Sequence, residues 1–212
     1  MPSYNMEQRS AEWFSVRLGK ATGSRIADVV GKTKDGKRYL AARANYMSEL
    51  LCERLTGVVQ TNFVSREMQW GIDNEEPARK LYMKRKGVDV KLMGFVTHPF
   101  FVDSGCSPDG LIRDDGMVQF KCPLTTTHLE YLLSNEVPEE YVPQMQWEMA
   151  CTGRSWSDFV SFDPRLPDHL SMYIKPLPRD SNYINTLENE VAKFLAELQE
   201  KYLELQRFQP QQ

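Results

Sequence analysis

The stretch that decides the fold is Ser107-Pro108-Asp109-Gly110, followed after a short polar turn by Met117-Val118-Gln119-Phe120-Lys121-Cys122-Pro123. Apolar runs bounded by Pro, Asp and Gly predict two strands joined as a hairpin, which brings Asp109 beside the second strand. Because side chains alternate along a strand, Gln119 and Lys121 emerge on one face and the phenylalanine between them points to the other. The sequence therefore predicts a small polar cluster on one face of a sheet.

This polar cluster contains the residue types that Mg²⁺-dependent cleavage of a phosphodiester needs, namely hard oxygen ligands and a cation. Candidate metal ligands are Asp109, Gln119 and the main-chain carbonyl of Phe120, with Mn²⁺ as a substitute for Mg²⁺. Lys121 is a candidate to position or polarise the attacking water, and Glu75 on an acidic helix is a candidate to reach the metal directly or through water. The bare spacing is common, and taken alone it predicts no more than a turn and a strand.

Composition and charge limit the classes of protein to which the chain can belong. The 212 residues are 41% hydrophobic and 26% charged, which predicts one globular domain over residues 1–212. No apolar run is long enough to span a bilayer and the N-terminus has no apolar signal-peptide core, so we expect a cytoplasmic protein without a membrane partner. The formal net charge is −3, yet residues 17–43 are rich in Lys and Arg. That basic segment is either a solvated face or a phosphate-binding surface.

The hydrophobic spacing predicts a mixed α/β fold with a central sheet flanked by helices. We expect a helical part at about 1–86, a sheet core at about 87–176 and a long amphipathic helix at about 182–208. Pro77 is expected to kink or break the helical pattern of residues 66–86. Further helices are expected at 12–18, 22–31, 39–55, 126–133 and 141–151, and strands at 88–96, 100–106, 117–122, 156–162 and 170–174.

Four blocks of the sequence, in order, resemble one nuclease family. They are Trp13-Phe14-Ser15-Val16-Arg17-Leu18-Gly19 with Thr22 and Ser24, Trp70-Gly71-Ile72-Asp73-Asn74-Glu75, Cys106-Ser107-Pro108-Asp109-Gly110-Leu111 with Lys121-Cys122-Pro123, and Tyr141-Val142-Pro143-Gln144-Met145-Gln146. Each block alone is weak evidence, and their shared order and spacing carry the assignment. The chain is identified as a member of the YqaJ/phage lambda exonuclease family of PD-(D/E)xK nucleases, which implies a restriction-endonuclease-like core.

The resemblance implies roles for individual positions. Arg17, Thr22 and Ser24 match residues that bind the 5′-phosphate side of DNA, and Met68 matches an apolar wedge that separates the strands. The matching active-site positions are Glu75, Asp109, Lys121 and Gln144. The resemblance thus implies that the N-terminal helical part binds DNA.

The basic loop at 32–38 follows the block that contains Arg17. With a nuclease site expected nearby, contact with the phosphate backbone becomes the favoured interpretation of this loop. The residues expected to make that contact are Lys34, Lys37 and Arg38.

Position 119 departs from the family, which has Glu or Asp there. The amide of Gln119 keeps the shape of Glu but loses the charge, and an amide oxygen holds Mg²⁺ less well than a carboxylate. We therefore expect strongly reduced cleavage. An engineered Glu-to-Gln form that binds DNA without cutting it is the favoured explanation, and a naturally degenerate paralogue is the other.

The function implied by the family is a Mg²⁺-dependent 5′-to-3′ exonuclease that degrades one strand of linear double-stranded DNA to mononucleotides and leaves a 3′ single strand. The implied partners are double-stranded DNA ends, further copies of the chain in a ring-shaped homotrimer, and a single-strand annealing protein (Redβ-like) in phage-type recombination inside a bacterial cell. An endonuclease or repair nuclease of the same superfamily is one alternative. A DNA-end-binding scaffold with a decayed nuclease site is the other.

Overall fold

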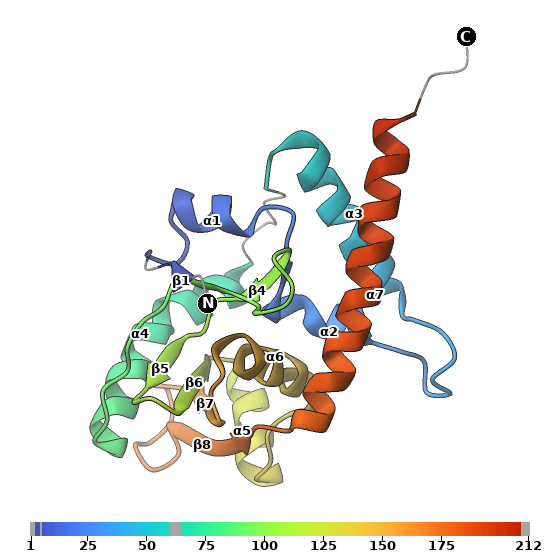
Figure 1. Ribbon diagram of the computed structural model, residues 1–212. Helices are drawn as coiled ribbons and strands as arrows, with labels where there is room; N and C mark the ends of the chain where they lie inside the picture. Colours follow the sequence, from blue (N-terminus) through green and yellow to red (C-terminus); the bar gives the residue numbers. More distant parts are fainter. Residues whose placement is uncertain (1–2, 5, 60–64, 209–212) are drawn as a thin grey trace.

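The computed structural model describes residues 3–4, 6–59 and 65–208. Its helices and strands are arranged as shown in Figure 1. In chain order they are β1 (Ser3–Tyr4), α1 (Ala11–Arg17), β2 (Ala21–Thr22), the 3₁₀ turn η1 (Gly23–Arg25), α2 (Ile26–Val30), α3 (Ala41–Thr56), α4 (Arg66–Lys86), β3 (Phe95–Thr97), β4 (Ser104–Cys106), β5 (Gly110–Ile112), β6 (Gly116–Lys121), α5 (Thr125–Ser134), the 3₁₀ turn η2 (Glu139–Tyr141), α6 (Val142–Thr152), β7 (Trp156–Phe162), β8 (Met172–Pro178) and α7 (Ser181–Gln206).

The strands form two four-stranded mixed sheets, with the orders β1-β3-β4-β2 and β5-β6-β7-β8. In the second sheet β6 runs parallel to β7, while β5 and β8 are antiparallel to their neighbours. The predicted mixed α/β fold with flanking helices and a long C-terminal helix is confirmed. The strand expected at 88–96 is mostly irregular, because Val88 and Val90 are held by packing against α4 and β6 rather than by a strand ladder.

The two faces of β6 are covered by different helices. Val118 and Phe120 point to α4, where the rings of Phe120 and Tyr82 meet edge to face with their centroids 5.7 Å apart. Met117 points the other way and packs against Met149 of α6. Because side chains alternate along a strand, the next residues on the α6 side are those of the predicted polar cluster. The core thus fixes the direction in which the candidate site faces.

The expected break at Pro77 is wrong, since α4 runs without interruption from Arg66 to Lys86. Proline removes one helical hydrogen-bond donor and crowds the preceding turn. The following turn holds Ala78 and Tyr82, which are completely buried against the sheet. Burial of that turn outweighs the local cost of proline and keeps the helix whole.

Helix α7 packs on the helices α2, α3 and α6 and supplies one side of the largest apolar cluster. Figure 1 shows α6 lying between α7 and the strands β5 to β8. The α7 residues buried in that cluster are Leu187, Val191, Phe194 and Leu198. In the part of the chain that the structure describes, no helix combines the length and apolar character needed to cross a membrane.

Candidate active site

A polar cavity of about 240 Å³ lies where the β5–β6 hairpin meets α4, α6 and the N-terminal segment. It is lined by Gln8, Arg9, Trp13, Arg17, Ser24, Glu75, Ser107, Asp109, Gln119, Phe120, Lys121, Gln144 and Glu148. All five residues that the sequence predicted to be catalytic are in this set, and so are Arg17 and Ser24. The fold therefore gathers into one space residues from Gln8 to Glu148, which are 140 positions apart in the chain.

The hairpin places Asp109 against β6 as the sequence predicted. Gly110 pairs with Val118, and the preceding Asp109 then turns its carboxylate back onto the strand. Its Oδ2 atom accepts a hydrogen bond of 2.7 Å from the main-chain N–H of Phe120 and another from Nε2 of Gln119. Glycine is required at 110, because a Cβ there would collide with Val90.

A chain of side-chain hydrogen bonds connects Lys121 to Gln119 through α6. The ammonium of Lys121 donates to Oε1 of Gln144 at 3.4 Å, and Nε2 of Gln144 donates to Oε1 of Gln119 at 3.1 Å. The same Nε2 atom donates to Oε1 of Glu148 at 2.8 Å. Lys121 also lies 4.7 Å from the ring centroid of Tyr141, a cation–π contact. Gln144 thus holds both the lysine and position 119.

Negative charge is poorly compensated inside the cavity. Burial, together with the nearby carboxylate of Glu75, raises the pKa of Asp109 to about 7, against the opposing effect of Lys121. Burial and then the charge of Asp109 raise the pKa of Glu148 to about 8. Two carboxylates that hold their protons this tightly lack a strong positive partner. Such a site is stabilised by a bound cation.

The donor chemistry of the cavity fits a divalent metal ion. In the described ranges 3–4, 6–59 and 65–208, no group of three His, Cys, Asp or Glu side chains is close enough to form a complete protein cage. However, Oε2 of Glu148 is buried and has no hydrogen-bond partner, which is unusual for a carboxylate oxygen. Glu75 lines the same cavity and is paired with Arg9, with 2.9 Å between Oε2 and Nη2. Mg²⁺ commonly binds a few protein oxygens and keeps several waters, so a partial ligand set is sufficient.

Arg17 and Ser24 approach the cavity from the N-terminal side. Arg17 donates from Nη1 to Oγ of Ser107 at 3.1 Å, and its guanidinium lies 3.9 Å from the ring centroid of Trp13. Trp13 donates to the same Oγ atom at 2.8 Å. Burial lowers the pKa of Arg17 from its usual value of 12.5. The arginine is therefore a half-buried, oriented cation at the edge of the polar cavity.

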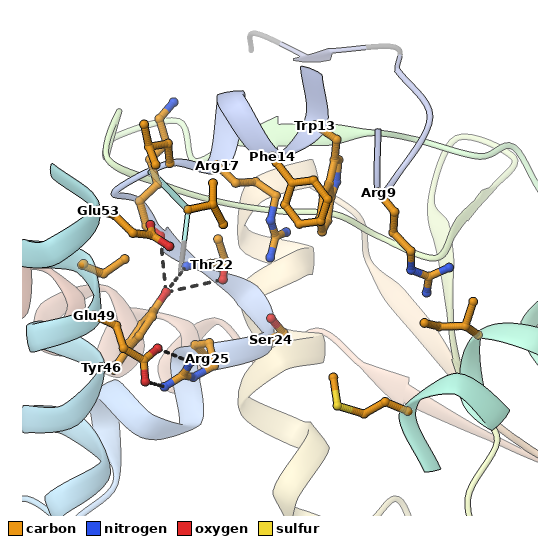
Figure 2. A pocket seen from close by; sticks show the side chains of 16 residues that line it. Arg9, Trp13, Phe14, Arg17, Thr22, Ser24, Arg25, Tyr46, Glu49 and Glu53 are labelled. Carbon is orange, nitrogen blue, oxygen red and sulfur yellow. Dashed lines mark hydrogen bonds and ion pairs between the residues drawn. The ribbon is translucent and has the colours of Figure 1, made fainter. Parts of the chain in front are cut away.

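A second cavity of about 490 Å³ adjoins the first and shares four of its residues. Figure 2 shows Arg17 extending from α1 into this space toward Ser24. Thr22 and Met68 line the second cavity and are absent from the lining of the first. The residues common to both are Arg9, Trp13, Arg17 and Ser24.

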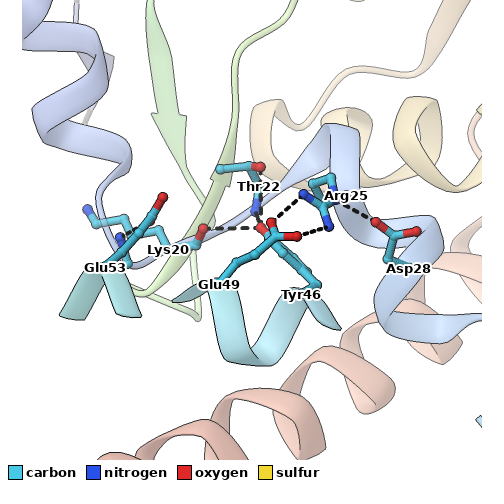
Figure 3. A network of polar contacts seen from close by, with 8 residues as sticks. Lys20, Thr22, Arg25, Asp28, Tyr46, Glu49 and Glu53 are labelled. Atoms are coloured by element: carbon cyan, nitrogen blue, oxygen red, sulfur yellow. Dashed lines mark hydrogen bonds and ion pairs between the residues drawn. The ribbon is translucent and has the colours of Figure 1, made fainter. Parts of the chain in front are cut away.

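The floor of the second cavity is held by a polar network around Tyr46 (Figure 3). The main-chain N–H of Thr22 donates to the hydroxyl of Tyr46 at 2.9 Å, and that hydroxyl donates to the carbonyl of Lys20 at 3.3 Å. Arg25 donates from Nη1 to Glu49 at 2.7 Å. Together these bonds tie β2 and η1 to α3, which fixes Thr22 and Ser24 in place.

The basic loop does not lie beside the polar cavity, contrary to the expectation that the site is nearby, and its contact with the phosphate backbone stays a prediction. Figure 1 shows the loop between α2 and α3 on the far side of α7 from the β5–β6 hairpin. Lys32 and Tyr39, at its two ends, both bond to Glu190 of α7, which anchors it there. The loop residues Lys34, Lys37 and Arg38 are absent from the linings of both cavities.

Five residues that line the polar cavity were not predicted to do so from the sequence, namely Gln8, Arg9, Trp13, Ser107 and Glu148. Glu148 lies four residues after Gln144 and so on the same helix face, a spacing that was a usable signal. Trp13 belongs to the first sequence block, where it was given no role, and it lines both cavities. Arg9 binds Glu75 across 66 positions of sequence, and no local pattern indicates that contact.

Comparisons with known proteins agree with this geometry. The profile of the YqaJ-like viral recombinase domain matches residues 12–155. An alkaline exonuclease from Laribacter hongkongensis, LHK-Exo, is 45% identical with a TM-score of 0.86, covering 93% of this chain and 97% of that chain. LHK-Exo in complex with dAMP gives 44% identity, a TM-score of 0.87 and the same coverage.

A phage related exonuclease from Haemophilus somnus 129PT is 17% identical over 88% of this chain and 94% of that chain, and its TM-score of 0.67 shows a shared fold. Among curated proteins no sequence matches. The profile match covers well over half of the chain, and the resemblance read from the four sequence blocks is confirmed. The chain belongs to the YqaJ-like viral recombinase family.

Proposed function

We propose that the protein is a divalent-metal-dependent nuclease acting on DNA, and more narrowly a 5′-to-3′ exonuclease that degrades one strand of linear double-stranded DNA. It releases mononucleotides and leaves a 3′ single strand. The observation that carries the proposal is the polar cavity, where Asp109, Lys121 and Gln144 share one space with Arg17 and Ser24. Family membership and the 45% identity to an alkaline exonuclease support nuclease chemistry, and the complex of that relative with dAMP supports a mononucleotide product.

Each side of the cavity has its own task in this proposal. Arg17 and Ser24 bind the phosphate at the 5′ end, with the arginine providing a charge-assisted hydrogen bond. Binding there fixes the neighbouring phosphodiester against Lys121, whose ammonium is held by Gln144. Lys121 orients the attacking water and stabilises the charge that develops on the phosphate oxygens. Cleavage then removes one nucleotide from the 5′ end.

The proposed metal site uses oxygen donors that already line the cavity. Asp109, Gln119, the main-chain carbonyl of Phe120 and Glu75 would hold Mg²⁺, or Mn²⁺ in its place. The ion, when bound, supplies a Lewis acid for the phosphate and lowers the pKa of a bound water. Arg9 keeps the carboxylate of Glu75 at the cavity.

The larger cavity is the proposed path for the DNA end. All of its lining residues fall between Arg9 and Ile72, within the N-terminal part at about 1–86. Met68 acts there as the wedge between the strands, and Thr22 contacts the 5′-phosphate side. The sheet core at about 87–176 then carries the chemistry, so that residues 1–212 work as one nuclease domain.

Gln119 is the proposed defect of this site. Its amide nitrogen donates to Asp109 while its oxygen accepts from Gln144, a pattern that a carboxylate cannot copy without taking up a proton. The amide therefore satisfies both neighbouring side chains, but it presents one negative charge fewer to a metal ion than a carboxylate would. Cleavage is reduced or abolished as a result. The same feature supports a second candidate function, a DNA-end-binding scaffold that binds without cutting.

A digestion assay with end-labelled linear duplex tests the proposal. The Gln119→Glu form in Mg²⁺ is expected to release labelled mononucleotides from 5′-labelled strands first, and faster when the 5′ end carries a phosphate. Covalently closed circles should resist digestion. Equal cutting of circles and linear DNA would instead indicate an endonuclease, and binding of ends without any cutting would indicate the scaffold.

The assembly and setting of the protein follow from the same proposal. A ring-shaped homotrimer would encircle the duplex and deliver the 3′ strand to a single-strand annealing protein in the cytoplasm of a bacterial cell. Sedimentation equilibrium should then give three times the chain mass of 24.6 kDa. A monomer at micromolar concentration would contradict the ring.

A further inference from the structure

Glu148 is a buried carboxylate that lines the active-site cavity. Neither the sequence nor the proposed function assigns it a role. It lies on α6 with 1% of its surface exposed, and it lines the polar cavity together with Asp109 and Lys121. Its Oε1 atom accepts the 2.8 Å hydrogen bond from Gln144, whereas Oε2 has no partner. Among the residues that the structure describes, this is the one carboxylate oxygen that is both buried and unpartnered.

Such an oxygen is costly to keep unless something binds it. A carboxylate removed from water loses its solvation, and this loss is recovered only through hydrogen bonds or a cation. Gln144 supplies one bond, and Lys121 is already engaged by Gln144 and Tyr141. The close packing of η1 on α6 holds the side chain inward, because even a Cβ on Gly23 would lie 3.6 Å from Cγ of Glu148. The site is thus shaped to keep a free carboxylate oxygen at the cavity.

The chemistry of position 119 indicates what that oxygen binds. Metal affinity depends strongly on the number of anionic ligands, and Gln119 provides none. Glu148 and Gln119 are both hydrogen-bonded to the same amide nitrogen of Gln144, so they approach the cavity side by side. We propose that Glu148 is an anionic ligand of the divalent metal ion and partly replaces the negative charge that position 119 lacks. This inference rests on the proposed metal-dependent function.

Mn²⁺ binding in the absence of DNA tests the proposal directly. Electron paramagnetic resonance or calorimetry would compare the parent chain with Glu148→Gln. The matched control is Glu200→Gln, which removes one negative charge from an exposed position on α7. We expect Glu148→Gln to weaken Mn²⁺ binding by about tenfold or more and the control to leave it unchanged. Gln119→Glu introduced into Glu148→Gln should restore affinity.

Thermal unfolding in EDTA separates a metal ligand from a structural residue. Removing a buried carboxylate with an unpaired oxygen should leave the metal-free protein as stable or more stable, while the metal-induced rise in Tm becomes smaller. Should Glu148→Gln fail to fold, Glu148→Asp keeps the charge and withdraws it by one methylene, and the same loss of Mn²⁺ affinity is expected.

Unchanged Mn²⁺ affinity in Glu148→Gln would overturn the proposal, as would a parent chain that binds no Mn²⁺ at millimolar concentration. The outcome is separate from that of the nuclease proposal. Mn²⁺ binding that depends on Glu148, together with no digestion of DNA by the Gln119→Glu form, would refute only the nuclease. Digestion by that form, together with Mn²⁺ affinity that is independent of Glu148, would refute only the ligand.

Discussion

Glu148 on α6 and Glu190 on α7 are both buried, yet their surroundings are opposite. Burial would raise the pKa of Glu190, but hydrogen bonds from Tyr39, Lys193 and Lys32 outweigh it and lower the pKa to about 2. Glu148 has one neutral donor, and burial raises its pKa to about 8. The carboxylate that anchors a loop to α7 is fully paired, whereas one left partly unpaired costs stability and marks a functional site.

The largest effect is expected at Lys121, which lines the polar cavity together with Glu148. Lys121→Met, made in the Gln119→Glu form, should lower the rate of nucleotide release by about 10²–10⁴-fold, because the water and the developing phosphate charge lose their cation. Lys175→Met on β8 is the control and should cut normally. Single-turnover digestion of linear duplex measures the effect, and a change of less than about threefold would contradict a catalytic role for Lys121.

A smaller effect is expected at Arg17. Arg17→Ala should reduce the preference for a 5′-phosphate over a 5′-hydroxyl by about tenfold or more, because a charge-assisted hydrogen bond is removed. Lys84→Ala is the matched control, since Lys84 is an exposed residue of α4 that lines neither cavity. Digestion rates on paired substrates with the two kinds of end give the ratio. An unchanged ratio in Arg17→Ala would place the phosphate elsewhere.

On the structural side, Glu190→Gln should lower the free energy of unfolding by about 2 kcal/mol at pH 7, after allowance for solvent screening near the surface. The folded pKa of Glu190 lies below its usual 4.5, so this stabilisation is present above pH 4.5 and is lost as the pH falls toward 2. Urea unfolding between pH 7 and pH 3 measures it, with Glu200→Gln as control. A difference between parent and variant that stays constant with pH would contradict the pairing.

The smallest effect is expected at the basic loop, which Glu190 anchors away from the cavities. Replacing Lys34, Lys37 and Arg38 together by Ala should weaken DNA binding and reduce its salt dependence by about one unit of slope for each phosphate that the loop no longer neutralises. Cleavage of bound DNA should be unaffected. Binding measured from 50 to 200 mM salt decides this, and an unchanged slope would show that the loop is only a solvated surface.

The sequence predicted correctly the features that depend on local spacing, and those that depend on the four sequence blocks shared with the family. Asp109, Gln119 and Lys121 come together because a hairpin and the alternation along one strand are sufficient to place them. Gln144 and Arg17 were assigned through the family resemblance, and the structure brings both to the same cavity. Single residues within long patterns were harder, as Pro77 shows, because burial of the next turn outweighs local propensity.

What the sequence did not predict depends on tertiary geometry. The pairing of Arg9 with Glu75 joins segments 66 positions apart. The basic loop is near Arg17 in sequence and remote in space, because α7 intervenes and binds its ends through Glu190. The spacing of Glu148 from Gln144 indicates a shared helix face, but the lack of a partner for its Oε2 atom depends on the tertiary structure around it.

Mg²⁺-dependent release of mononucleotides from 5′-phosphorylated linear duplex, measured for the parent chain and for Gln119→Glu, tests directly whether the polar cavity is a nuclease site. If the polar cavity is a nuclease site limited by its missing charge at position 119, the Gln119→Glu form should digest DNA at least about 100-fold faster. Equal rates in the two forms, whether both fast or both absent, would contradict the account.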